Sequence, residues 1–209
     1  MCTVALLAFA GAIGVALAPW FFAGSSADAG AATRYFTVQT GIVVAVVALV
    51  FAATTASARA PSRLAEFARG VATVDALITG IVATFVIGDA SSQPVLHVVV
   101  PVVMALWWVL LPPRVRVPGW WAVAFSVHVV AWLVVTLAVV RVVTRGWVPY
   151  AIIDPSAPGG WPAVAGWSAA IVALAVAAGA LCVVIARAAP WRAATRRLLG
   201  LSPTGSGRR

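Results

Sequence analysis

Apolar residues dominate six stretches of the chain, and polar residues, Pro and Gly gather in the breaks between them. The stretches lie at about 3–23, 35–55, 70–88, 95–111, 120–144 and 167–187. Each has about the length that crosses the hydrocarbon core of a bilayer as a helix. The apolar runs are continuous and do not alternate with polar residues, which favours helices over the strands of a barrel. The pattern predicts an all-α bundle of about six transmembrane helices.

Composition supports a membrane-embedded chain. Hydrophobic residues make up 63% of the sequence and charged residues only 9%, whereas soluble domains carry about a quarter charged residues. Such a chain cannot cover a water-facing surface, so lipid is its main solvent. We expect residues 1–187 to form a single transmembrane domain, followed by a basic tail at 188–209. Its amphipathic part, 191–201, can lie on the anionic inner leaflet.

The distribution of arginine predicts the orientation. All 14 basic residues are arginine, and the net charge is +9. A nucleic-acid partner is excluded because these arginines sit in short loops and in the tail rather than on one soluble face. With six spans, eleven arginines fall on the side of the loops 56–69 and 112–119 and of the tail, and three fall on the other. The positive-inside rule then places both termini in the cytoplasm.

The N-terminal stretch allows a second interpretation. Residues 1–23 could be a signal peptide cleaved after Ala29 instead of a first helix; the other five helices would keep their topology. Abundant Ala, Val and Arg without lysine are typical of a GC-rich bacterial genome. We therefore expect a multi-pass protein of a bacterial inner or plasma membrane.

Polar residues inside the predicted spans are few, and two of them share one depth. Thr37 lies just inside the outer end of its helix, and His97 just inside the outer end of another. Both are about 3–5 Å below the outer boundary at 1.5 Å rise per residue, as a nucleophile and its general base would be. Pro101 cannot bond the His97 carbonyl, so the helix should be kinked or loosened there. The alternative is a kinked helix whose histidine bonds a neighbouring hydroxyl or a headgroup.

The remaining polar residues have structural interpretations. Thr37, Thr40 and Gly41 share one helix face, where threonine usually bonds its own backbone or packs between helices. Asp75 could pair with Arg69, face the bundle interior, remain protonated or carry a proton or ligand. His128, near the middle of its helix, is expected to be a hydrogen-bonded bundle residue. The sequence has no P-loop and no metal-binding spacing, and its two cysteines form no framework, so we expect no metal and no cofactor.

Four segments, in order, resemble the androgen-induced membrane-protein family and its bacterial six-pass relatives. They are 34–41 (RYFTVQTG), 96–101 (LHVVVP), 111–114 (LPPR) and 146–155 (GWVPYAIIDP). The resemblance covers about residues 34–187. Animal members of that family are threonine hydrolases of fatty-acid esters of hydroxy fatty acids, so the resemblance implies such a hydrolase with Thr37 and His97 as its essential pair. Thr40 and Gly41 stand where the family has Ser-Asn, so an amide that could assist catalysis is missing. The His-to-Pro spacing fits the bacterial pattern and differs by one residue from the animal one.

The sequence therefore predicts a lipid-ester hydrolase near the outer membrane boundary, with membrane lipid around it. Candidates for supporting roles are an oxyanion donor and a residue that orients His97: Gln39, Thr40, Asp89, Tyr150 and Asp154. The alternatives are a non-catalytic protein that binds a lipid or small hydrophobic ligand, and a small transporter. Few deep polar residues disfavour transport; a polar track from Asp75 through His128 to His97 would favour it. The sequence leaves the oligomeric state open.

Overall fold

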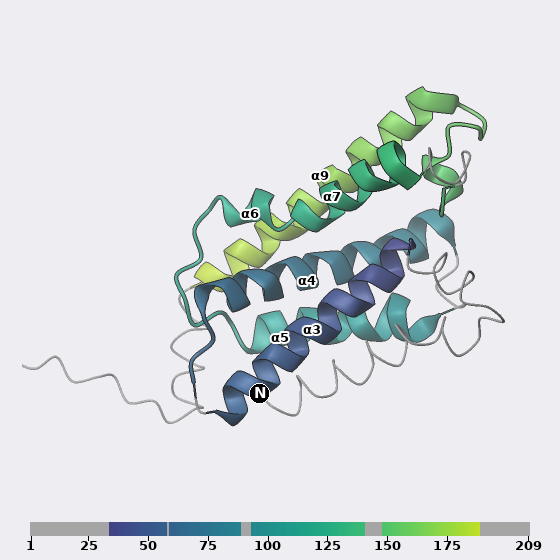
Figure 1. Cartoon of the computed structure of the whole chain (residues 1–209). Coiled ribbons are helices and arrows are strands. Elements are labelled where there is room, and N and C mark those ends of the chain that lie inside the picture. Colours follow the sequence, from purple (N-terminus) through teal and green to yellow (C-terminus); the bar gives the residue numbers. More distant parts are fainter. Residues whose placement is uncertain (1–33, 58, 89–92, 141–147, 189–209) are drawn as a thin grey trace, which may run out of the picture.

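The part of the chain that the structure describes is all-helical, as predicted. The computed structural model describes residues 34–57, 59–88, 93–140 and 148–188, and every regular element within these ranges is a helix (Figure 1). The predicted first span, at 3–23, and the tail beyond residue 188 lie outside the described residues. So does Asp89.

The helices follow one another along the predicted spans. Three of them contain wider, π-helical turns, which bear the label η, as does one short 3₁₀ helix. In chain order the elements are α3 (Phe36–Ala56), α4 (Arg63–Ile81) with η1 (Val82–Ile87), η2 (Val95–Val99) with α5 (Val100–Leu110), α6 (Trp121–Ala124), α7 (Val127–Val135) with η3 (Thr136–Val140), the 3₁₀ helix η4 (Ala151–Ile153), and α9 (Gly160–Arg187).

Four helices are long and apolar enough to cross a membrane. They cover Phe36–Ala56, Arg63–Ile87, Trp121–Ala138 and Gly160–Arg187, and a shorter apolar helix covers Val95–Leu110. Large apolar side chains stay exposed on their outer faces, as on α9 at Leu181 and Val184. Helices that expose such faces need lipid as their solvent. The described residues thus indicate a multi-pass membrane protein.

Two helices begin about two turns earlier than the apolar pattern predicts. Helix α4 starts at Arg63 rather than at residue 70, because the Ser62 hydroxyl accepts the Ala65 N–H at 3.1 Å and caps the helix. Helix α9 starts at Gly160 rather than at residue 167. Polar or small residues in the first turns lower local hydropathy without ending a helix, so hydropathy alone placed both starts too late.

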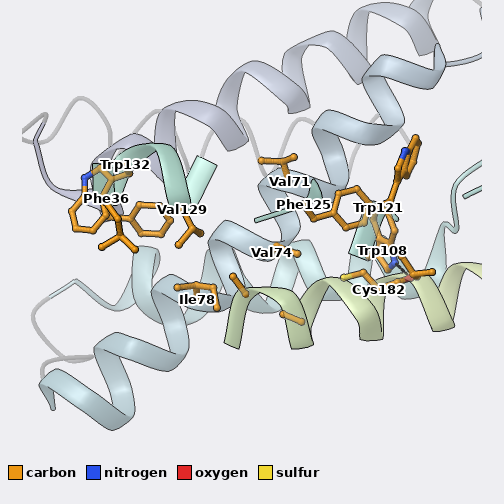
Figure 2. Packing of buried hydrophobic residues seen from close by; sticks show 14 of the residues in the cluster. Phe36, Val71, Val74, Ile78, Trp108, Trp121, Phe125, Val129, Trp132 and Cys182 are labelled. Carbon is orange, nitrogen blue, oxygen red and sulfur yellow. Dashed lines mark hydrogen bonds between the residues drawn. The ribbon is translucent and has the colours of Figure 1, made fainter. Parts of the chain in front are cut away.

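Helix α4 is the centre of the bundle. One hydrophobic cluster packs it against α3 and α5 around Phe51, Met104 and Trp107. A second cluster packs it against α6, α7 and α9, with Phe125 filling the space beside Gly70 (Figures 1 and 2). In Figure 2 the Trp108 indole donates its N–H to the Cys182 carbonyl, at 2.9 Å. The central helix therefore fixes where every neighbour lies.

A buried ion pair on α4 ties one end of the bundle together. Arg69 lies 2.7 Å from Glu66 and donates to the Leu111 carbonyl at 2.8 Å, while Glu66 accepts the Arg114 N–H at 3.1 Å. The guanidinium also lies over the rings of Phe51, Trp107 and Trp108, 5.0–5.5 Å from their centroids. The prediction that Arg69 sits in a loop is wrong, because these partners make its burial in the helix favourable.

Candidate functional site

Wider helical turns gather at the opposite end of the bundle from the Glu66–Arg69 pair. Element η1 ends the α4 helix there, η2 begins the next helix, and η3 ends α7. A π-helical turn fits one more residue than an α-helical turn, and such turns often mark functional sites. Around η1 and η2 the helices enclose a cavity.

The cavity has a volume of about 240 Å³ and is lined mainly by apolar side chains. Its polar groups are two threonine hydroxyls, an imidazole, a carboxamide, two phenols and an indole N–H. The lining residues among the described ones are Tyr35, Phe36, Thr37, Ile78, Thr79, Val82, Ala83, Ile87, Gln93, His97, Val129, Trp132, Tyr150, Ile152, Ile153 and Ile171. An apolar wall with a few convergent polar groups is typical of small-molecule sites.

Thr37 and His97 both line this cavity, although they are 60 residues apart in the chain. The sequence placed them at one depth, and the structure adds that they share one cavity. Thr37 lies in the first turn of α3 and His97 in the middle of η2, and both side chains are partly buried. A ligand in the cavity can therefore contact a hydroxyl and an imidazole together.

Tyr150 brings a third polar group to Thr37. Its phenol oxygen lies 3.5 Å from the Thr37 hydroxyl, and it accepts the Thr37 N–H at 3.4 Å. This N–H belongs to the first turn of α3, where amide groups have no partner within the helix. Burial raises the pKa of the Tyr150 phenol above its ordinary value, although the contacts with Thr37 oppose this shift. The phenol consequently stays protonated at neutral pH and can donate.

The turn around His97 is loosened, as Pro101 predicts. Element η2 is π-helical over Val95–Val99 and ends two residues before the proline. The His97 carbonyl faces Gly80 of α4, where a β-carbon would lie only 2.9 Å from it and 2.9 Å from the Pro101 ring. Gly80 thus allows the widened helix to approach α4 closely, and this approach sets the position of His97.

Aromatic rings surround the first turn of α3. The Tyr150 ring meets Tyr35 and Trp132 edge to face, with centroids 5.5 and 5.7 Å apart, and Trp132 lies 5.3 Å from Phe36. The Trp132 indole donates to the Arg34 carbonyl at 3.0 Å. We call Tyr35, Phe36, Trp132 and Tyr150 the aromatic collar. The collar holds the segment that carries Thr37 against α7 and the loop before α9.

Of the other predicted supporting residues, the structure describes Gln39, Thr40 and Asp154, and none of these three lines the cavity. Thr40 is buried and accepts the Thr79 hydroxyl at 3.3 Å. Gln39 follows on α3, and its N–H bonds to the Tyr35 carbonyl at 3.2 Å. Asp154 accepts the N–H and the hydroxyl of Ser156, at 2.8 and 2.7 Å, so it shapes the loop after η4. The catalytic roles suggested for these residues stay predictions.

A buried pair deeper in the bundle was not foreseen as a pair. Asp75 of α4 lies 2.7 Å from His128 Nδ1 of α7, and its carboxylate is fully buried. The sequence suggested Arg69 as one partner for Asp75, but Arg69 bonds Glu66 instead. The His128 ring stacks on Phe36 of the aromatic collar, with centroids 5.4 Å apart. Gln93 was also missed as a lining residue, because it falls between two predicted spans.

Comparisons of the chain with protein-family models, curated proteins and solved structures found no match. The resemblance of the four segments to the androgen-induced family stays a prediction, and the residues of the cavity alone carry the functional argument.

Proposed function

We propose that the chain is a membrane-embedded lipid-ester hydrolase in which Thr37 is the nucleophile and His97 the general base. The observation that supports this most directly is that both residues line one largely apolar cavity. Their positions near the outer ends of two helices also put them at one depth. An apolar cavity suits the chain of a lipid, and the hydroxyl and imidazole suit an ester.

The chemistry needs two steps. First, the Thr37 oxygen attacks the ester carbonyl carbon while His97 takes the hydroxyl proton. The bond to the alcohol oxygen breaks, the alcohol leaves with the proton from His97, and an acyl-threonine remains. Water then attacks the acyl carbon and gives a proton to His97. The fatty acid leaves, and the Thr37 oxygen recovers that proton.

Tyr150 is the residue best placed to stabilise the negative oxygen of each tetrahedral intermediate. Its phenol lies beside the Thr37 hydroxyl, 3.5 Å away, and remains neutral because burial raises its pKa. A neutral phenol can donate its O–H to an oxyanion, whereas a phenolate would repel it. Tyr150 also contacts the Thr37 backbone, because its phenol oxygen accepts the Thr37 N–H at 3.4 Å.

We further propose six spans with both termini in the cytoplasm, in the inner or plasma membrane of a bacterium. The arginine distribution supports this orientation. The end of the bundle that holds the cavity then faces outward, and the end with Glu66 and Arg69 faces the cytoplasm. Membrane lipids can enter such a site from the outer leaflet.

Labelling of the purified full-length protein with a fluorophosphonate probe in detergent tests the proposal. We expect wild type to label and both Thr37→Ala and His97→Ala to lose labelling. Thr79→Val is the matched control, because it removes another hydroxyl from the same cavity wall. It should label at the wild-type rate.

The opposite result would favour the non-catalytic alternative. If wild type does not label, or if Thr37→Ala labels as wild type does, the hydrolase proposal fails. The cavity would then be the site of a protein that binds a lipid or a small hydrophobic ligand without turnover. Binding of a fluorescent fatty acid to the Thr37→Ala variant would support that function.

A further inference from the structure

We propose that Asp75 and His128 are positioning residues for the cavity, acting on Thr37 through the ring of Phe36. The inference extends the proposed function, because it assigns a role at the same site to a pair deeper in the membrane. Neither residue lines the cavity among its described residues. The proposed role is to orient the Thr37 side chain toward the cavity, and it does not require Thr37 to be catalytic.

The pair is costly to bury and therefore calls for an explanation. The Asp75 side chain is 0% exposed, and one of its oxygens, Oδ1, has no hydrogen-bond partner among the described residues. Ionisable residues at membrane depth are rare and are usually retained for function. The other oxygen, Oδ2, lies 2.7 Å from His128 Nδ1. This hydrogen bond holds the plane of the imidazole, whichever of the two atoms carries the shared proton.

The imidazole in turn supports Phe36. The two rings stack with an interplanar angle of 28° and centroids 5.4 Å apart. On its other side Phe36 meets Trp132, whose indole bonds the Arg34 carbonyl at 3.0 Å. Phe36 is thus held between a fixed histidine and a fixed tryptophan.

Thr37 follows Phe36 directly in the first turn of α3. A helical residue cannot rotate without its neighbour, so the rotation of Phe36 about the helix axis sets the direction of the Thr37 side chain. Thr37 then meets the Tyr150 phenol, which is part of the same aromatic collar. The line of contacts from Asp75 through His128 and Phe36 consequently ends at the hydroxyl in the cavity.

The test measures how accessible the side chain at position 37 is to a reagent in the cavity, and it does not rely on catalysis. Thr37→Cys is made in a Cys2→Ser, Cys182→Ala background, and the rate of modification by a small methanethiosulfonate reagent is followed on the full-length protein in detergent. We expect Asp75→Leu, His128→Leu and Phe36→Leu each to change this rate by about fivefold or more, which corresponds to a loss of about 1 kcal/mol in positioning. Asp75→Asn keeps an acceptor for Nδ1 and should remain within about twofold of the parent.

Two controls separate positioning from general destabilisation. Glu66→Gln alters another buried carboxylate of α4, about 14 Å along the helix axis from Asp75; it should lower the melting temperature but leave the modification rate unchanged. A double variant, Asp75→Leu with Phe36→Leu, should change the rate no more than either single variant, because both act through one contact. If the Asp75→Leu protein does not fold, the test uses His128→Leu instead, together with the double variant His128→Leu with Phe36→Leu.

The proposal is overturned if Asp75→Leu and His128→Leu leave the rate within about twofold of the parent, or if Glu66→Gln changes it equally. Fluorophosphonate labelling of the otherwise wild-type protein is measured in parallel. If the wild type does not label but the modification rate at position 37 changes in the Asp75 and His128 variants, the hydrolase is refuted and the positioning role is retained. Labelling that persists unchanged in Asp75→Leu and His128→Leu would refute the positioning role and retain the hydrolase.

Discussion

Among single residues, the Tyr150 phenol is the group whose protonation the site depends on most directly. Burial raises its pKa above the ordinary value of about 10. A raised pKa means that the folded protein holds the proton more tightly than the unfolded chain does. The corresponding stability is therefore fully present below about pH 10 and is lost as pH rises through the folded pKa.

The chain makes this prediction simple to check, because Tyr35 and Tyr150 are its only tyrosines. In a Tyr35→Phe variant, phenolate absorbance reports Tyr150 alone. We expect its midpoint to lie above pH 10. The Thr37→Ala variant in the same background should titrate still higher, since the threonine hydroxyl contact lowers the pKa. A midpoint below 10 would show that the phenol is solvated and unsuited to the role of donor.

Removal of the Tyr150 hydroxyl should slow the reaction without unfolding the protein. Tyr150→Phe keeps the ring contacts with Tyr35 and Trp132 but deletes the donor. Loss of one oxyanion donor slows acyl transfer on the order of a hundredfold, and we expect a decrease of this order in the fluorophosphonate labelling rate. Tyr35→Phe, which also keeps its ring, is the matched control and should label normally.

The sequence could identify Thr37 and His97 because depth in a membrane follows from helix boundaries and rise per residue. It could not pair Asp75 with His128, which lie 53 residues apart. That pairing depends on how α4 and α7 are rotated toward each other, and rotation is set by packing across the whole bundle. The sequence did not identify Gln93 as a lining residue, because a polar residue in a break between two predicted spans is ordinary.

At the scale of helices, the widened turn before Pro101 and the glycine opposite it, Gly80, together set the position of η2 against α4. Gly80 leaves room for the His97 carbonyl, and a β-carbon there would lie 2.9 Å from it. Gly80→Ala should push η2 away from α4 and misplace His97. We expect a fall in the labelling rate of about tenfold, as a small displacement of a catalytic group costs about this much or more.

The natural comparison is Gly166→Ala on α9, where a β-carbon would meet open space. This variant should label like wild type and should be at least as stable, because alanine favours a helix more than glycine does. Equal labelling rates in the Gly80→Ala and Gly166→Ala proteins would contradict the proposed role of the close approach.

The Glu66–Arg69 pair gives a prediction about the other end of α4. Glu66→Ala leaves a guanidinium buried without its carboxylate, and we expect a loss of about 3–5 kcal/mol in the free energy of unfolding. Replacing both residues, as Glu66→Leu with Arg69→Met, should cost much less, because no charge is left buried. Thermal unfolding of the three proteins in one detergent decides between these outcomes. A double variant as unstable as Glu66→Ala would contradict this account.

The same pair explains why Arg69 lies in the helix that Ser62 caps rather than in a loop. Hydropathy assigned Arg63 and Arg69 to a loop because charged residues are costly in lipid. Burial of Arg69 is compensated by the Glu66 carboxylate one turn away on the same helix, and by a carbonyl and three aromatic rings that come from distant parts of the fold. A local pattern cannot include partners that only tertiary packing supplies.

For the molecule as a whole, the orientation in the membrane is the prediction with the widest consequences. In a Cys2→Ser, Cys182→Ala background, Ser156→Cys should react with an impermeant maleimide in intact cells. Arg116→Cys should react only after the membrane is opened. Position 156 lies in the loop near the cavity and position 116 in the loop near Glu66. The reverse pattern would place the cavity on the cytoplasmic side.

The fold class was predictable from the sequence because lipid allows so few solutions for an apolar chain. The arrangement of the helices was not. That α4 is the centre, with α3 and α5 on one side and α6, α7 and α9 on another, follows from particular contacts such as those of Gly70 and Phe125. Hydropathy records how apolar a helix is but not which neighbours it has.

The central place of α4 has a consequence for biosynthesis. Its carboxylate at Asp75 is made 53 residues before His128, the partner that satisfies it. While the nascent chain ends short of α7, this helix must enter the bilayer with an unpaired acidic group or wait beside the insertion machinery. Insertion of α4 and completion of the bundle are therefore coupled.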